Sequence, residues 1–151
     1  VQLEKVSGYI DSGKSDGGEI VAWGKYDNSS GGHFVHPTVF AKTNSDMSIV
    51  KEEIFGPVLC AQPFSDQDLD KIATAANNTT FGLAASVWTK NISTAHKLAA
   101  KIRSGTVWIN CHNIFDASLP FGGYKESGWG REMGHEVLKN YTELKAVTVN
   151  L

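Results

Sequence analysis

Apolar residues recur along the chain at two spacings, which predict an alternation of helices and strands. Leu3, Val6 and Ile10 fall on one helical face, and Gly13 with the Asp-Gly-Gly cluster at 16–18 ends that helix. The same spacing predicts helices over 65–76, 93–103 and 132–141, the first of these capped by Ser65 or Asp66. Short apolar runs predict strands over 19–24, 33–40, 57–64, 83–89, 106–110 and 144–151.

The order of these elements indicates an α/β protein. Strands alternate with helices between positions 57 and 110, which is typical of parallel strands joined by crossover helices, and two crossovers are expected there. The polar stretch 27–32 predicts a surface turn. Residues 111–132 have many glycines and no period, so we expect an irregular segment. The final run, 144–151, predicts a half-buried strand with no neighbouring hairpin partner.

Composition narrows the class of protein. The chain has 151 residues, 41% hydrophobic and 20% charged, which is typical of one globular domain. The net charge of −2 without a basic stripe argues against nucleic acid as a partner. No apolar stretch approaches the ~18 residues of a membrane span and no signal peptide is recognisable, so the expected location is the cytoplasm. Cys60 and Cys111 are expected to be reduced and buried.

Two segments carry the most informative chemistry. Glu53 and Phe55 precede a Gly-Pro pair, and in an extended segment they would lie on the same side, where a carboxylate and a ring could grip a ribose and pack on a flat group. The alternative is a helix end with ordinary solvated acids. In the second segment, 120–132, glycines permit close backbone contact, while Phe115 and Phe121 offer flat apolar walls. A pocket wall and a core cluster are equally consistent with this pattern.

Three other patterns carry less weight. The five histidines are scattered and have no acidic or thiol cluster at ligand spacing, so no metal site is expected. The glycines at 128–134 follow no hydrophobic strand, which argues against a dinucleotide fingerprint. Cys111 and His112 are adjacent at a strand end and point opposite ways, so a thiolate and imidazolium pair is not expected.

Five motifs together resemble the NAD(P)-dependent aldehyde dehydrogenase family, in its order and at its intervals. They are KEEIFGPV, NNTTFGLAASVWT, GTVWIN, PFGGYKESGWGRE and YTELKAVTVNL. The resemblance covers the whole chain and is to the C-terminal part of the subunit. The stretch NIFDASLPFGG is most similar to bacterial enzymes of the phenylacetaldehyde dehydrogenase type, which implies an apolar or aryl aldehyde as substrate.

The resemblance implies a fold, a cofactor and site residues. The fold would be the α/β, parallel-stranded αβα catalytic-domain portion over 1–126, a return segment and helix over 127–142 and an oligomerisation strand over 143–151. That strand would join a neighbouring subunit in a homo-dimer or homo-tetramer. Glu53 matches the carboxylate that holds the nicotinamide ribose of NAD or NADP, and Phe55 matches the ring beside the nicotinamide. Phe115 and Phe121 match aromatic walls of the aldehyde tunnel.

The same resemblance implies what the 151 residues do not contain. The family's nucleophilic cysteine, general-base glutamate, oxyanion asparagine and Rossmann domain all match positions before Val1, and neither Cys60 nor Cys111 takes the nucleophile's place. In the intact enzyme that cysteine would form a thiohemiacetal, pass hydride to NAD(P)+ and release the acid by hydrolysis. We therefore expect this chain alone to be inactive. The alternative is a non-catalytic binding or assembly module that uses its terminal strand.

Overall fold

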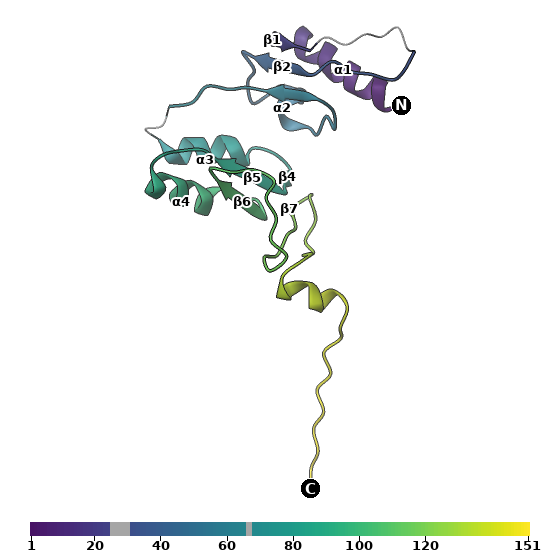
Figure 1. Ribbon diagram of the computed structural model, residues 1–151, viewed down its shortest axis with the longest axis vertical. Helices are drawn as coiled ribbons and strands as arrows, with labels where there is room; N and C mark the ends of the chain where they lie inside the picture. The colour runs from purple at the N-terminus through teal and green to yellow at the C-terminus, as the bar shows by residue number, and fades with distance from the viewer. Residues whose placement is uncertain (25–30, 66–67) are drawn as a thin grey trace. The chain divides into compact units, whose positions relative to one another are not determined.

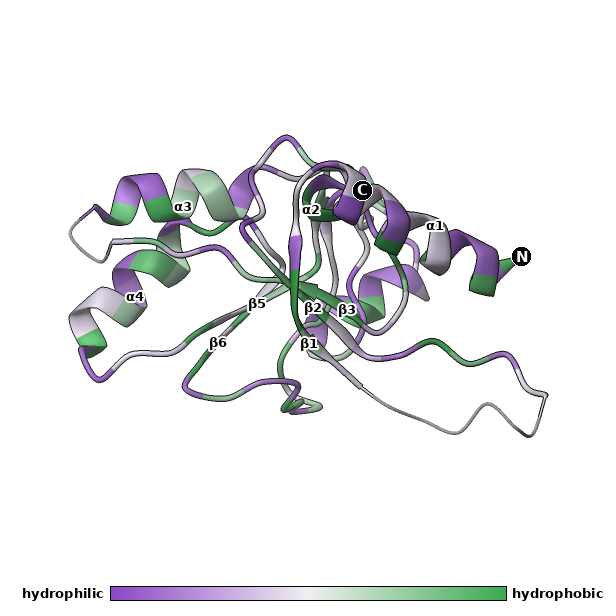
Figure 2. Ribbon diagram, turned by 90° about the horizontal axis from the view of Figure 1, so that it is seen from above, coloured by the Kyte–Doolittle hydropathy of each residue, from purple (hydrophilic) through white to green (hydrophobic). Residues whose placement is uncertain are grey.

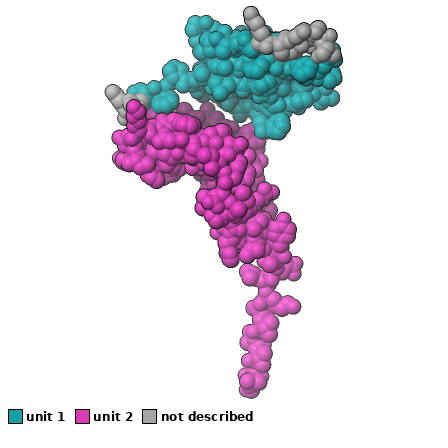
Figure 3. All heavy atoms as spheres, viewed as in Figure 1, with its two compact units in different colours: residues 1–68 teal, residues 69–151 magenta. Residues whose placement is uncertain are grey.

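The computed structural model describes residues 1–24, 31–65 and 68–151. The chain divides into two compact units, Val1–Asp68 and Leu69–Leu151, shown in different colours in Figure 3. Figure 1 labels their helices and strands. No helix in the described ranges is long and apolar enough to cross a membrane.

Unit 1 is a three-stranded sheet with two helices. The sheet order is β1-β2-β3, with β1 antiparallel and β3 parallel to the central strand. Apolar side chains of the first helix pack with Phe40, which is completely buried, and with Ile49. Gly13 permits this close packing, because a Cβ atom there would lie 2.7 Å from Ile49 Cδ1. The elements are α1 (Gln2–Ser15), β1 (Glu19–Trp23), β2 (Thr38–Ala41), α2 (Ser48–Lys51) and β3 (Val58–Cys60).

Unit 2 is built around one parallel strand pair. Strands β5 and β6 pair with Ser86 opposite Trp108, and α4 is the crossover between them. Ala95 and Leu98 of that helix pack with Val87 of β5 in a buried cluster. Figure 2 shows hydrophobic and hydrophilic residues alternating along α3 and α4. The elements are α3 (Leu69–Asn77), β4 (Phe81–Gly82), β5 (Ala84–Val87), α4 (Ile92–Lys101), β6 (Thr106–Ile109), β7 (Tyr124–Lys125) and the 3₁₀ helix η1 (His135–Asn140).

Local end signals explain where the main helix of unit 2 begins and ends. The side chain of Asn91 accepts a hydrogen bond from the backbone N–H of Thr94 at 3.1 Å, which satisfies one of the unpaired N–H groups of the first turn of α4. At the other end, Asn77 donates to the carbonyl of Lys101 and accepts from the N–H of Arg103. The side chain of Asn77 therefore ties the end of α3 to the end of α4.

The structure confirms the predicted parallel α/β character but changes the strand pairing. Two strand-helix-strand crossovers exist, β2-α2-β3 and β5-α4-β6. Of the two crossovers predicted between positions 57 and 110, β5-α4-β6 is formed within unit 2, while the strand over 57–64 is β3, which pairs with β2 within unit 1. The strand predicted over 33–40 is formed only at Thr38–Ala41, after Pro37, which cannot donate a ladder hydrogen bond.

The last part of the chain differs most from the expected elements. The helix predicted over 132–141 is the shorter 3₁₀ helix η1. The irregular segment 111–132 contains the short strand β7, which pairs with β4, and a bridge between Phe121 and Glu132. Within the described ranges no strand includes residues 144–151, and their apolar side chains are exposed. The turn predicted over 27–32 lies largely outside the described residues, and so does the cap Asp66.

Candidate functional site

The first candidate segment follows α2 in unit 1 and exposes both of its predicted residues. Ile54 is buried and anchors the segment, while Glu53 and Phe55 on either side of it are exposed. Phe55 has a φ of 54°, so the backbone is not extended there as the sequence suggested. The side chain of Gln2 donates to the carbonyl of Phe55 at 2.9 Å, and Gly56 lies against Val6. The backbone is thus held on both sides, and the Phe55 ring is left 75% exposed.

The two neighbouring carboxylates of this segment have different surroundings. Tyr9 donates its hydroxyl to Glu52 Oε2 at 2.8 Å, and this hydrogen bond to a carboxylate raises the pKa of Tyr9 above 10.0. The side chain of Glu53 makes no hydrogen bond or ion pair with the described part of the chain. Glu53 is therefore the carboxylate of this pair that is available to an incoming hydroxyl group.

The second candidate site is a hollow of about 220 Å³ in unit 2. Phe115 and Phe121 meet edge to face with ring centroids 5.1 Å apart, and Phe115 meets Trp108 in the same way at 5.6 Å. Such edge-to-face contacts orient aromatic rings relative to one another. The structure thus brings together the two phenylalanines that the sequence singled out. The lining consists of Thr106, Val107, Trp108, Cys111, Ile114, Phe115, Asp116, Leu119, Pro120 and Phe121.

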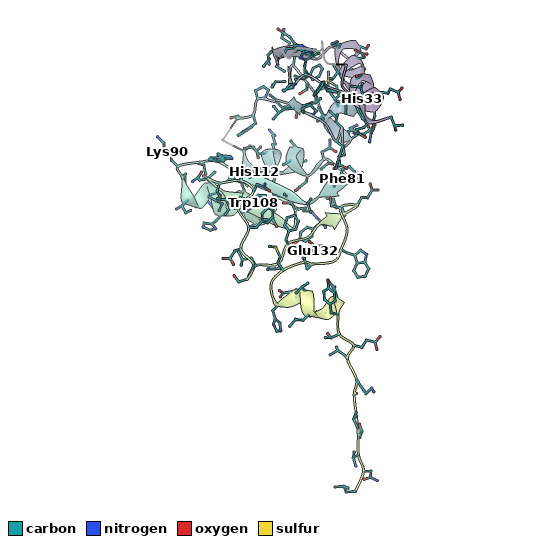
Figure 4. The ribbon with its side chains drawn as sticks, turned by 45° about the vertical axis from the view of Figure 1, so that its right-hand side comes forward. His33, Phe81, Lys90, Trp108, His112 and Glu132 are labelled. Atoms are coloured by element: carbon teal, nitrogen blue, oxygen red, sulfur yellow. The ribbon has the colours of Figure 1, made fainter. Side chains whose placement is uncertain are left out.

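Trp108 is a wall residue that sequence reasoning did not identify. It is 9% exposed, and its indole N–H donates to the carbonyl of Ile114 at 2.7 Å. His112 meets the same indole edge to face, with 5.2 Å between ring centroids, and Figure 4 shows the two labelled residues near each other. The sequence signal for this arrangement is weak, because Trp108 appears only as one more apolar residue of a predicted strand.

Asp116 provides the only carboxylate in the lining of this hollow. The backbone N–H of Ser118 and then its hydroxyl donate to Asp116 Oδ1, at 2.9 and 2.7 Å, and both lower the pKa of the aspartate. The group therefore remains ionised near neutral pH. A negative charge at this position disfavours anionic ligands and leaves neutral ones unaffected.

Two glycines of segment 120–132, Gly122 and Gly123, pack closely against neighbouring residues of unit 2. A Cβ atom on Gly105 would collide with the carbonyl oxygen of Gly122, which in turn lies against Gly130. Arg131 fixes the loop by donating to the carbonyls of Gly123 and Gly130, both at 2.8 Å. Trp129 of this loop remains 94% exposed.

The cysteines have no arrangement that would make them nucleophiles. Both are free thiols, but they are half-buried and not fully buried as the sequence predicted. Cys60 donates to the carbonyl of Ile49 at 3.3 Å, and burial raises the pKa of its thiol, which lowers the fraction of reactive thiolate. Cys111 lines the hollow in unit 2, while His112 bonds to Ser86. Among the described residues, no cluster of three or more histidine, cysteine or acidic side chains could hold a metal ion.

Comparison with known proteins gives consistent matches over the whole chain. Residues 1–147 match the Aldehyde dehydrogenase family. The chain is 51% identical over 150 residues to the putative aldehyde dehydrogenase DhaS of Bacillus subtilis and 45% identical to human mitochondrial aldehyde dehydrogenase. These alignments cover 99% of this chain but only 30% and 28% of the two relatives, so the chain spans about a third of their length.

Solved structures give the same result. The NAD+ complex of an aldehyde dehydrogenase from Bacillus cereus matches 99% of this chain with a TM-score of 0.90 and 49% identity. An indole-3-acetaldehyde dehydrogenase complexed with NAD+ matches 99% with a TM-score of 0.92 and 43% identity. Each alignment covers 30% of the solved chain.

Proposed function

The chain belongs to the aldehyde dehydrogenase family, and from this premise we propose that it is the C-terminal portion of an enzyme that oxidises an apolar or aryl aldehyde with NAD(P)+. The observation that carries the proposal is the hollow in which Trp108, Phe115 and Phe121 are in edge-to-face contact. Aromatic walls bind a flat apolar group, and the ionised Asp116 disfavours an anionic one.

The cofactor role falls to Glu53 and Phe55. An exposed carboxylate accepts hydrogen bonds from the two hydroxyls of a ribose, and the exposed ring of Phe55 offers an apolar face to the nicotinamide. NAD(P)+ supplies the acceptor for the hydride. The two residues would orient the reactive end of the cofactor, a contribution of position and not of chemistry. Similar solved structures that contain NAD+ support the choice of cofactor.

The catalytic nucleophile is not one of the cysteines of this chain. Cys60 is bound to a backbone carbonyl and has a raised pKa, and Cys111 has no hydrogen bond to His112. We propose that a cysteine outside these 151 residues attacks the aldehyde, and that the chain alone oxidises none. NADH production by the chain with phenylacetaldehyde, abolished by Cys60→Ser or Cys111→Ser, would contradict this.

The test uses a hybrid enzyme, in which residues 1–151 replace the matching segment of the Bacillus cereus aldehyde dehydrogenase. The hybrid is expected to reduce NAD+ with phenylacetaldehyde, and Phe121→Ala is expected to raise KM for this substrate more than KM for acetaldehyde, because only the aryl group reaches the wall. Circular dichroism and gel filtration against the unaltered enzyme serve as the folding control. A folded hybrid without activity would refute the proposal.

The partner we propose is a second copy of the same chain, bound through residues 143–151. The apolar side chains at 144, 147, 149 and 151 are exposed, and an extended segment of this kind adds to the edge of another sheet. Deletion of residues 144–151 should convert a dimer or larger assembly into a monomer, measured by sedimentation at micromolar concentration. A clean monomer before and after deletion would contradict this.

The alternative is a non-catalytic binding or assembly module. It would retain the association through residues 143–151 but show no response to NAD+ or aldehyde, so a titration with NAD+ and a native mass measurement distinguish the two. The expectation that the enzyme is cytoplasmic rests on the sequence alone and stays a prediction.

A further inference from the structure

A short turn follows β6 and leads to the aromatic wall of unit 2. Side-chain hydrogen bonds of Asn110, His112 and Trp108 hold this turn in place. The backbone reverses here because Asn110 and Asn113 both have positive φ, 54° and 57°, a conformation that asparagine tolerates better than most residues. The reversal brings residues 110–114 back over the strands from which the chain has just emerged.

The first fastening is a two-point contact at the end of β5. Asn110 Oδ1 accepts from the backbone N–H of Thr89, and Asn110 Nδ2 donates to the carbonyl of Thr89, both at 2.9 Å. The backbone N–H of Asn110 also donates to the carbonyl of Val87 at 2.9 Å. The start of the turn is therefore fixed to the neighbouring strand by three hydrogen bonds.

The second fastening is a hydrogen bond of 2.7 Å between Ser86 Oγ and His112 Nδ1, in which either atom could be the donor. Ser86 stands opposite Trp108 in the strand register, so the bond holds the imidazole against the indole. The two rings meet nearly edge on, with 70° between their planes. In Figure 4 His112 and Trp108 lie next to each other at this end of the strand pair.

Trp108 connects the His112 ring to the hollow, because Trp108 both contacts His112 and lines the hollow. Its N–H holds the carbonyl of Ile114, and its ring meets Phe115, which meets Phe121. The residues that line the hollow do not include Ser86 or His112. The pair therefore acts on a ligand indirectly, through the Trp108 ring that His112 contacts and through the turn that carries the lining residues Cys111 and Ile114.

We infer that Ser86 and His112 are positioning residues that fix the Trp108 ring and thereby set the selectivity of the hollow for aryl aldehydes. The inference rests on the proposed function of the hollow. The pair would favour a flat ring that contacts Trp108 and leave a two-carbon aldehyde unaffected, because the latter makes few contacts with the wall.

Two variants remove the hydrogen bond between Ser86 and His112 in different ways. Ser86→Ala deletes the hydroxyl, and His112→Phe keeps a ring against Trp108 but has no Nδ1. In the full chain of 151 residues each should speed hydrogen exchange of the Trp108 indole N–H, measured by NMR, by about threefold to tenfold, as expected when one hydrogen bond is lost. The double variant should give no more than either single one, because both remove the same interaction.

The kinetic arm uses the hybrid enzyme. Ser86→Ala should raise KM for phenylacetaldehyde by about threefold to tenfold, with kcat and the KM for acetaldehyde unchanged. Ser86→Thr keeps the hydroxyl and should restore both the exchange rate and the KM. Ser93→Ala and His96→Phe, at exposed positions of α4, are the matched controls.

The exchange measurement tests the positioning role of Ser86 and His112, and the activity of the hybrid enzyme tests the proposed function. Unchanged indole exchange in both Ser86→Ala and His112→Phe would overturn the positioning role, and so would faster exchange with an unchanged ratio of the two KM values. A hybrid that oxidises neither aldehyde would refute the proposed function, whereas the exchange rates would still decide whether the pair holds Trp108.

Discussion

The two candidate segments differ in how much of their surroundings their own unit supplies. Around Glu53 and Phe55, unit 1 fixes the backbone through Gln2 and Ile54 but leaves both side chains open. In unit 2 the ring of Phe115 has an aromatic neighbour on each side, and together they enclose a hollow. The three rings of unit 2 thus already contact one another in this chain, whereas the side chains of Glu53 and Phe55 are exposed.

The largest expected effect is on stability. Trp108→Ala should lower the free energy of unfolding by about 3–5 kcal/mol, because it leaves a cavity beneath the wall. Phe55→Ala should change it by no more than about 0.5 kcal/mol, because the ring is already exposed. Urea unfolding followed by circular dichroism measures both. Trp129→Ala removes an exposed indole of the same size and is the matched control, and a loss there equal to that of Trp108→Ala would contradict the comparison.

The next effect is on activity. Glu53→Gln in the hybrid enzyme should slow hydride transfer by about tenfold or more, because a nicotinamide ribose that is held less well spends less time in the reactive position. Overall NAD+ affinity should change less, since in the proposed role Glu53 would hold only one end of the cofactor. Single-turnover NADH formation and a separate NAD+ titration measure the two quantities.

The neighbouring carboxylate provides the control for that experiment. Glu52 is already bound to Tyr9, so Glu52→Gln should leave hydride transfer unchanged. Equal effects of the two substitutions would show that general acidity of this segment, and not the position of Glu53, matters.

A smaller effect is expected for ligand binding to the isolated chain, where the hollow of unit 2 and the segment around Glu53 should respond to different ligands. The neutral ligand 2-phenylethanol should shift NMR signals of residues 106–121 with a Kd in the millimolar range, about −4 kcal/mol. NAD+ should affect signals near Glu53 without saturating at about 1 mM. Phe121→Ala should abolish the response to 2-phenylethanol, and a response of equal size in that variant would place the ligand elsewhere.

The smallest expected effect concerns the pH dependence of stability. The hydrogen bond to Glu52 raises the pKa of Tyr9 in the folded chain, so its contribution is complete below the ordinary tyrosine pKa of 10.0 and is lost as pH rises through the higher folded value. Tyr9→Phe should therefore flatten the decline in stability above pH 10.0. Tyr141→Phe, which removes an exposed hydroxyl, is the matched control. An identical decline in wild type and Tyr9→Phe would contradict the assignment.

The fold could be predicted where local spacing decides it. Val6 and Ile10 lie on the buried face of α1 as their spacing indicated, and Ala95 and Leu98 do the same in α4. The pairing of β4 with β7 could not be predicted, because each strand has two residues and they are separated by about forty positions. Short strands of this kind carry no periodicity of their own.

The site shows the same division. Phe115 and Phe121 were singled out from the sequence as flat apolar walls beside a glycine-rich segment, and the structure places them in contact. The turn beneath them was missed because it depends on the backbone angles of Asn110 and on bonds between residues more than twenty positions apart. Two asparagines three positions apart after a strand are the only local signal.

The wall segment between Phe115 and Phe121 is bounded at both ends by backbone anchors. Before it, the carbonyl of Ile114 is held by Trp108, and after it Phe121 exchanges two backbone hydrogen bonds with Glu132, at 2.8 and 2.7 Å. The side chains of residues 116–120 can therefore change while these two anchors, which use Trp108 and the backbone of Phe121 and Glu132, remain in place. In the enzyme that we propose, this separation of anchors and wall would let substitutions at five consecutive positions alter the substrate range at little cost in folding stability, so a duplicated gene would need few changes to reach a new aldehyde.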